Sequence, residues 1–162
     1  MKIEDFLSPA DVIVEQPALE KGQLLMALSQ RAAASLHLTP GKIADAILKR
    51  EKLGSTGVGN GIAIPHARFS EVQRPVGVLA LLSKPIDFEA VDGGPVDIVF
   101  LLLAPPAPGA DQLNALACIA RTLRDPAVLS DLRLATDSAE AFRAITSERG
   151  LPAPSQPAPP PS

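Results

Sequence analysis

His66 ends the stretch of sequence with the clearest chemical pattern, residues 53–66, which read LGSTGVGNGIAIPH. Four glycines within eight residues let the backbone adopt positive φ and approach a ligand closely. A neutral imidazole is a nucleophile, and the ordinary histidine pKa of about 6.5 leaves most of the side chain neutral near pH 7. The pattern therefore predicts that His66 is a reactive side chain beside a flexible loop.

The elements on either side of the glycines must hold this histidine in place. Residues 62–64 predict a half-buried strand. Pro65 has no backbone N–H, so we expect strand pairing to stop there and leave His66 at an edge of the sheet. Before the loop, a cation-rich helical turn containing Arg50 is followed by Gly54, which is typical of a helix end.

Phosphoryl chemistry fits these residue types. Backbone amides and hydroxyls of Ser55, Thr56 and Gly57 predict a loop that binds phosphate, because such turns form anion-binding concavities. Arg50 can add planar, charge-assisted hydrogen bonds to a phosphoryl group. In-line transfer to a ring nitrogen needs positioning and charge stabilisation more than acid–base catalysis. His66 can therefore act as a phosphoryl acceptor, with the modified ring nitrogen left open.

Other ligand chemistries fit the sequence less well. No lysine follows the glycines, as a P-loop requires, and the expected order of helix, glycines and strand reverses the dinucleotide-binding order. With two histidines, one cysteine and neither an HExxH nor a paired-cysteine pattern, we expect no metal site and no cofactor. Binding of a small anion without covalent transfer remains an alternative.

Composition limits the class of protein and partner. The 162 residues, 46% of them hydrophobic, can form one domain with a full core. A net charge of −3 and the lack of Trp and Tyr argue against a nucleic-acid partner. The longest apolar run, residues 98–104, is too short to cross a membrane, and the N-terminal segment does not resemble a signal peptide. One cysteine gives no disulfide framework, so we expect a cytoplasmic protein.

Periodicity predicts alternating helices and strands. The expected helices cover residues 21–36, 40–52 and 111–124, with two more beginning after Asp125 and Asp137. The expected strands cover residues 76–82, 85–88 (a minor one) and 96–104, the last of them central and covered on both faces. In the third helix, Leu113, Leu116, Ala117, Ala120 and Leu123 are expected to share the buried face. The predicted fold class is α/β (α+β), a mixed β-sheet flanked by helices on both faces.

The chain is expected to divide into a domain of residues 1–149 and a tail of residues 150–162. The tail holds six of the 17 prolines, which predicts a loose extension similar to polyproline. A solvated tail is favoured over a docking segment for a proline-binding domain.

Residues 53–66, with Arg50 ahead of them, resemble the active-site segment of the mannitol/fructose-type IIA domains of the bacterial phosphoenolpyruvate-dependent phosphotransferase system, and within that family its free-standing nitrogen-regulatory branch. The resemblance extends over roughly residues 1–148. It implies a mixed sheet between helices, with His66 accepting a phosphoryl group from a phosphohistidine on an HPr-like carrier. It also implies that Arg50 stabilises the phosphohistidine.

Gln112 marks a departure from that family. Many relatives have a second histidine early in the helix after the long strand, and here Gln112 takes that position, with Asn114 as the nearby alternative. An amide can hydrogen-bond an imidazole or a phosphoryl oxygen but cannot become a cation. We expect phosphotransfer to persist, with an altered rate or phosphohistidine lifetime.

The resemblance favours a regulatory phosphocarrier over an enzyme that turns over a small molecule. The sequence contains no IIB, IIC or membrane segment, which favours regulation of partner proteins over a step in sugar uptake. The alternatives are a sugar-specific IIA component that passes its phosphoryl group to a separate IIB protein, and a binding module that is not phosphorylated. The regulatory targets are left open.

Three further residues are expected to have ordinary roles. Arg68 would face the same side of an extended chain as His66, but a solvated surface arginine is the favoured interpretation. His37 is expected in a loop between helices. Cys118 is expected to be an unreactive thiol in the core.

Overall fold

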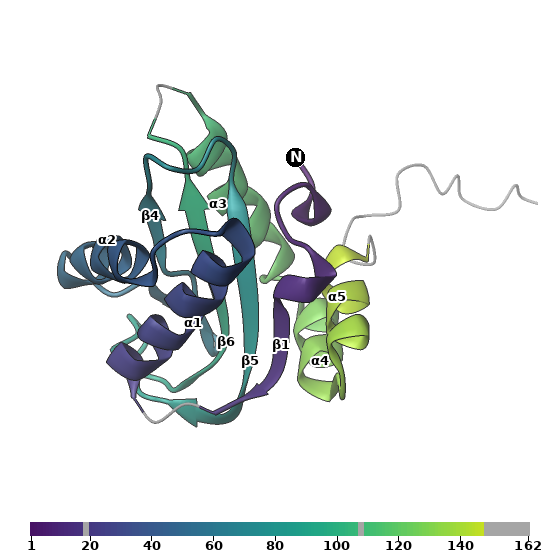
Figure 1. Cartoon of the computed structure of the whole chain (residues 1–162). Helices are drawn as coiled ribbons and strands as arrows, with labels where there is room; N and C mark the ends of the chain where they lie inside the picture. Colours follow the sequence, from purple (N-terminus) through teal and green to yellow (C-terminus); the bar gives the residue numbers. More distant parts are fainter. Residues whose placement is uncertain (18–19, 107–108, 148–162) are drawn as a thin grey trace, which may run out of the picture.

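The computed structural model describes residues 1–17, 20–106 and 109–147, which form a sheet covered by helices on both faces (Figure 1). In chain order, the elements of these residues are η1 (Ile3–Asp5), η2 (Pro9–Asp11), β1 (Val12–Gln16), α1 (Lys21–Leu36), α2 (Pro40–Lys52), β2 (Gly57–Gly59), β3 (Ile62–Ala63), β4 (His66–Arg68), β5 (Val76–Ile86), β6 (Val96–Ala104), α3 (Asp111–Thr122), α4 (Pro126–Leu134) and α5 (Ser138–Thr146). The predicted tail and its boundary at residue 150 lie outside the described residues.

The strands of the described residues form one mixed sheet in the order β1-β5-β6-β3-β2, with β4 also paired to β6. β5 and β6 are antiparallel, whereas β1 runs parallel to β5, and β3 and β4 run parallel to β6. β6 is therefore the central strand, as predicted, and its bounds match the expected residues 96–104.

Alternate side chains of β6 belong to two hydrophobic clusters on opposite faces of the sheet. Ile98, Phe100 and Leu102 join the cluster that contains the buried residues of α3, α4 and α5. Val99, Leu101 and Leu103 join the cluster under α1 and α2. This two-sided burial explains the nearly continuous apolar run, because every residue of β6 except Asp97 is buried.

The strand that leads to His66 differs from the prediction in two ways. Residues 62–64 are buried throughout, not half-buried, because β3 lies inside the sheet between β2 and β6. Pairing also does not stop at Pro65. The Pro65 carbonyl accepts from the Leu102 N–H at 2.9 Å, and parallel pairing with β6 resumes at His66. His66 thus lies on a strand that pairs with the central strand of the sheet.

Residues 85–88 do not form a separate strand, since β5 continues to Ile86.

α1 has the predicted bounds, whereas α3 is rotated relative to the prediction. Ala115, Cys118 and Ile119 form the buried face of α3, while Leu113 is 70% exposed. This sequence is apolar on more than one side, so helical periodicity alone could not select the buried face. α3 also ends two residues earlier than predicted, at Thr122.

The two later helices begin as expected. Asp125 and Asp137 occupy the N-cap positions, and their carboxylates accept from the N–H groups of Ala127 and Glu140. Among the described helices, none is both long and apolar enough to span a membrane.

Candidate functional site

His66 is half-buried at the start of β4, and its ring has a defined orientation. The Nδ1 atom lies 2.8 Å from the backbone oxygen of Ile64. A carbonyl oxygen can only accept a hydrogen bond, so Nδ1 carries the proton and donates it. The neutral ring then has its lone pair on Nε2. This geometry leaves Nε2, and not Nδ1, as the ring nitrogen with an available lone pair.

The surroundings of His66 favour the neutral ring. Burial is the largest effect and lowers the pKa of His66 below its ordinary value of 6.5. The hydrogen bond to the Ile64 oxygen raises this pKa, but by less than burial lowers it. The positive charge of Arg50 lowers this pKa further, and the negative charge of Glu51 opposes it. Both charges are at the end of α2, so this helix end lies within electrostatic range of the imidazole.

Arg50 is held by the loop that follows its own helix. Its Nη1 atom donates to the backbone oxygen of Gly54 at 2.9 Å. Gly54 has a φ of +154°, which ends α2 and turns the chain toward the glycine segment. This contact uses one guanidinium nitrogen, and the side chain is only half-buried. Arg50 can therefore offer further N–H groups to an anion near His66.

Glu51 is a buried member of this region that the sequence analysis did not find. Its carboxylate accepts from the backbone N–H of Thr56 at 3.3 Å and from the Thr56 hydroxyl, and it pairs with Lys21 at 2.8 Å. A signal was present in the sequence. Glu51 follows Ile43 and Ile47 at helical spacing, on the buried side of α2. The network ties the end of α2 to the glycine loop and to the start of α1.

The predicted phosphate loop uses its polar groups within the protein. The Ser55 hydroxyl donates to the Phe88 oxygen at 2.8 Å and accepts from the Gly57 N–H at 3.1 Å, and the Thr56 hydroxyl donates to Glu51. A Cβ atom on Gly57 would lie 2.8 Å from the Ala90 backbone, so only glycine fits there. These contacts give the three residues a role in shaping the loop. Their binding to a phosphoryl group remains a prediction.

Gln112 and Arg68 meet although they are far apart in the sequence. Gln112 lies in the first turn of α3, and its Oε1 accepts from the Nε of Arg68 at 2.8 Å. Arg68 is on β4, two residues after His66. Arg68 is exposed, as expected, but it is not simply solvated, because Gln112 holds one edge of its guanidinium. Asn114, the alternative to Gln112, is exposed on the same helix.

The other two residues of interest have the predicted ordinary environments. His37 is exposed and caps the C-terminus of α1 in the left-handed conformation, with a φ of 57°. Cys118 is buried, and burial raises the pKa of its thiol, which disfavours the reactive thiolate. Among the described residues, no group of three or more His, Cys, Asp or Glu side chains is arranged to hold a metal ion.

Comparison with known proteins gives the family. The family model described as phosphoenolpyruvate-dependent sugar phosphotransferase system, EIIA 2, matches residues 5–148. The chain belongs to this family. A nitrogen regulatory protein of Bradyrhizobium diazoefficiens is 43% identical over 152 residues, covering 94% of this chain and 97% of that protein. The resemblance found in the glycine segment is thereby confirmed over nearly the whole domain.

Solved structures confirm the fold class of this EIIA 2 family member. The nitrogen regulatory protein IIA-Ntr from Neisseria meningitidis superposes with a TM-score of 0.83 at 27% identity, covering 89% of this chain and 99% of that one. The mannitol IIA of Escherichia coli superposes with a TM-score of 0.72 at 18% identity, covering 85% and 97% of the two chains. The second likeness concerns the fold alone.

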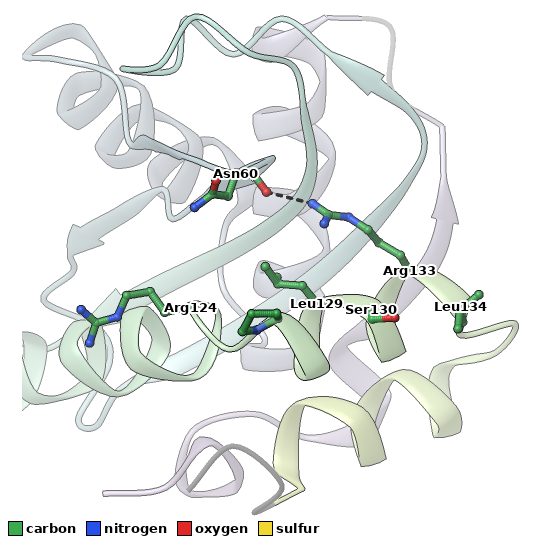
Figure 2. Close-up of a pocket in the computed structure, with 7 residues that line it drawn as sticks. Asn60, Arg124, Leu129, Ser130, Arg133 and Leu134 are labelled. Carbon is green, nitrogen blue, oxygen red and sulfur yellow. Dashed lines mark hydrogen bonds between the residues drawn. The ribbon is translucent and has the colours of Figure 1, made fainter. Parts of the chain in front are cut away.

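A separate hollow in this family member lies beside α4 (Figure 2). It has a volume of about 670 Å³, and its lining residues are Asn60, Arg124, Pro126, Leu129, Ser130, Arg133 and Leu134. Figure 2 shows the Arg133 guanidinium reaching the backbone oxygen of Asn60, a contact of 2.9 Å. Of these lining residues only Asn60 lies in the glycine segment, and none is His66, Arg50, Arg68 or Gln112.

Proposed function

We propose that this chain is a regulatory phosphocarrier of the phosphotransferase system. Nε2 of His66 accepts a phosphoryl group from a phosphohistidine on an HPr-like carrier. The phosphorylation state then governs the binding of regulatory partner proteins. The observation that carries the proposal is the Nδ1–H bond of His66 to the Ile64 oxygen, which leaves Nε2 with its lone pair next to the charge of Arg50.

The transfer needs no proton and no further reactant. The Nε2 lone pair forms the new N–P bond while the donor's N–P bond breaks, and that electron pair returns to the donor's ring nitrogen. The donor, whose second ring nitrogen carries a proton, becomes a neutral imidazole, and His66 keeps its proton on Nδ1. The charge is spread over the equatorial oxygens in the transition state, so nearby guanidinium groups stabilise it.

A regulatory role is supported by the nitrogen regulatory relatives and by the electrostatics of the modification. Phosphorylation adds about two negative charges to a surface that carries Arg50 and Arg68. An acidic partner surface that binds these arginines would bind more weakly after phosphorylation, and a partner surface that recognises the phosphoryl group would bind more tightly. The identity of the partners does not follow from the site.

The test is phosphorylation by phosphoenolpyruvate, enzyme I and an HPr-like carrier, followed by intact mass. We expect one phosphoryl increment that is acid-labile and absent from His66→Ala. His37→Asn is the matched control, because asparagine tolerates the left-handed position of this exposed residue, and it should be phosphorylated like the unmodified chain.

The same sample distinguishes the alternatives. Nitrogen-15 NMR of the product should locate the phosphoryl group on Nε2 of His66. No increment with a demonstrably phosphorylated donor would overturn the phosphocarrier and favour a binding module. Onward transfer to a IIB protein would instead identify a sugar-specific IIA component.

A further inference from the structure

Arg68 lies on the same side of β4 as His66. Side chains alternate along a strand, so residues two positions apart share a face about 6.6 Å apart along the chain. Ala67, between them, points the other way, into the cluster under α1 and α2. Ile62 and Ile64 precede His66 at steps of two along the chain, and their side chains belong to the hydrophobic cluster on the α3 face of the sheet. His66, Arg68 and the first turn of α3 therefore share one side of the sheet.

The contact with Gln112 orients the guanidinium without saturating it. Gln112 accepts from the Nε of Arg68 at 2.8 Å and is itself half-buried, so it is a steadier group than the exposed arginine. In the part of the chain that the structure describes, the two terminal nitrogens of Arg68 donate to no protein acceptor. These nitrogens are the pair that can bind two phosphoryl oxygens at once.

We propose that Arg68, held by Gln112, is a second guanidinium ligand of the phosphoryl group on His66, and that Gln112 acts as its positioning residue. This inference rests on the proposed phosphocarrier function. Arg50 reaches the site from the end of α2, and Arg68 reaches it from β4 with support from α3. Two guanidinium groups from different elements then enclose the oxygens of the phosphoryl group while it passes from the donor nitrogen to Nε2.

A contact with the phosphoryl group has a different signature from a contact with the donor protein. The equilibrium between phosphorylated donor and phosphorylated chain depends only on the separate proteins, so a group that touches only the donor complex cannot change it. A group that stabilises the phosphohistidine shifts this equilibrium toward the chain. The rate of transfer alone would not separate these two roles.

The experiment measures the rate and the equilibrium of transfer from the phosphorylated HPr-like carrier by intact mass. Arg68→Ala is expected to lower the equilibrium constant and the rate, each about 10-fold, because a charge-assisted hydrogen-bond pair is lost. Arg68→Lys should restore part of both, since it keeps the charge but not the fork. Arg143→Ala is the matched control, an exposed arginine on α5, and should match the unmodified chain.

A double-mutant cycle tests the role of Gln112. Gln112→Ala should reduce the equilibrium constant less than Arg68→Ala does, and the double variant should be no worse than Arg68→Ala alone. Additive losses would overturn the positioning role. An Arg68→Ala equilibrium equal to that of Arg143→Ala would overturn the ligand role while leaving the phosphocarrier intact. Failure of the unmodified chain to accept a phosphoryl group would overturn both. Thermal unfolding of each variant verifies that it is folded.

Discussion

Arginine side chains have different roles in two regions of the molecule, the turn around Arg133 and the region around His66. Arg133, on α4, donates through Nε and Nη2 to both oxygens of Asp97, each at 2.9 Å. Its Nη2 also donates to the Asn60 backbone oxygen at 2.9 Å (Figure 2). Arg50 and Arg68 each make one such contact, with Gly54 and Gln112. A guanidinium whose nitrogens are taken by protein acceptors fastens elements together, whereas one held at a single edge keeps donors for a ligand.

The backbone shows the same contrast. Gly61 has a φ of +81°, and a Cβ atom there would lie 2.5 Å from Arg133 Nη2 and 2.6 Å from Asp97 Oδ1. The turn between β2 and β3 is therefore built tightly around the Arg133–Asp97 pair. At the other end of the glycine segment, Gly54 has no heavy atom within 4 Å of its Cβ position. The glycine segment is thus closely packed where it meets α4 and has open space around Gly54, next to Arg50.

The largest expected effect is from Gly61→Val. The substitution strains a left-handed residue and forces a branched side chain into the Arg133–Asp97 pair, so we expect a loss of about 4 kcal/mol in the free energy of unfolding. Urea denaturation measures it. Gly41→Ala is the control, because Gly41 is helical and has open space around its Cβ position, and stability should stay equal or rise slightly. A loss below about 1 kcal/mol would show that the turn and Arg133 move apart easily.

Arg133→Ala tests whether the Arg133 turn and the His66 region act independently. It should lower the free energy of unfolding by about 1–2 kcal/mol, since a partly exposed, bidentate pair and a backbone contact are lost. Phosphoryl acceptance should be unchanged, which is the reverse of the result expected for Arg68→Ala. Arg124→Ala is the control, because Arg124 lines the same hollow (Figure 2) and should change stability by less than about 0.5 kcal/mol. A slower transfer in Arg133→Ala would mean that the regions are coupled.

The sequence predicted the features that depend on short-range pattern. The bounds of α1 and β6 follow from an apolar stripe and an uninterrupted apolar run, and His66 stands out by residue type and by the glycines before it. The buried face of α3 was wrong because its sequence offers more than one apolar side. The expected end of pairing at Pro65 was wrong because the Pro65 carbonyl still accepts from the Leu102 N–H of the parallel neighbour β6, although proline has no N–H of its own to donate.

The contacts that complete the site could not be read from the sequence. Arg68 and Gln112 are separated by 44 positions, and Lys21 reaches Glu51 from the start of a different helix. Arg68, Gln112 and Lys21 each have the pattern of an ordinary surface residue on their own element. The helical spacing of Glu51 marks it as buried but does not identify its partners. Only the packing of α1 and α3 against the sheet brings them to the loop and to β4. Single charged residues therefore acquire their roles from the tertiary structure.

The smallest expected effect is the pH dependence of the His66 region. Burial lowers the pKa of His66 below 6.5, so its ring should stay neutral and accept a phosphoryl group at pH values where an exposed histidine is protonated. Unfolding restores the ordinary pKa. Between the folded value and 6.5 the unfolded chain binds more protons, so stability falls as the pH drops through this window and is unaffected above it. NMR titration of the His66 ring gives the midpoint, and His66→Gln should remove this part of the pH dependence of unfolding. A midpoint at or above 6.5 would mean that Glu51 and the Ile64 carbonyl outweigh burial and Arg50, and that the neutral nucleophile is not favoured by the fold.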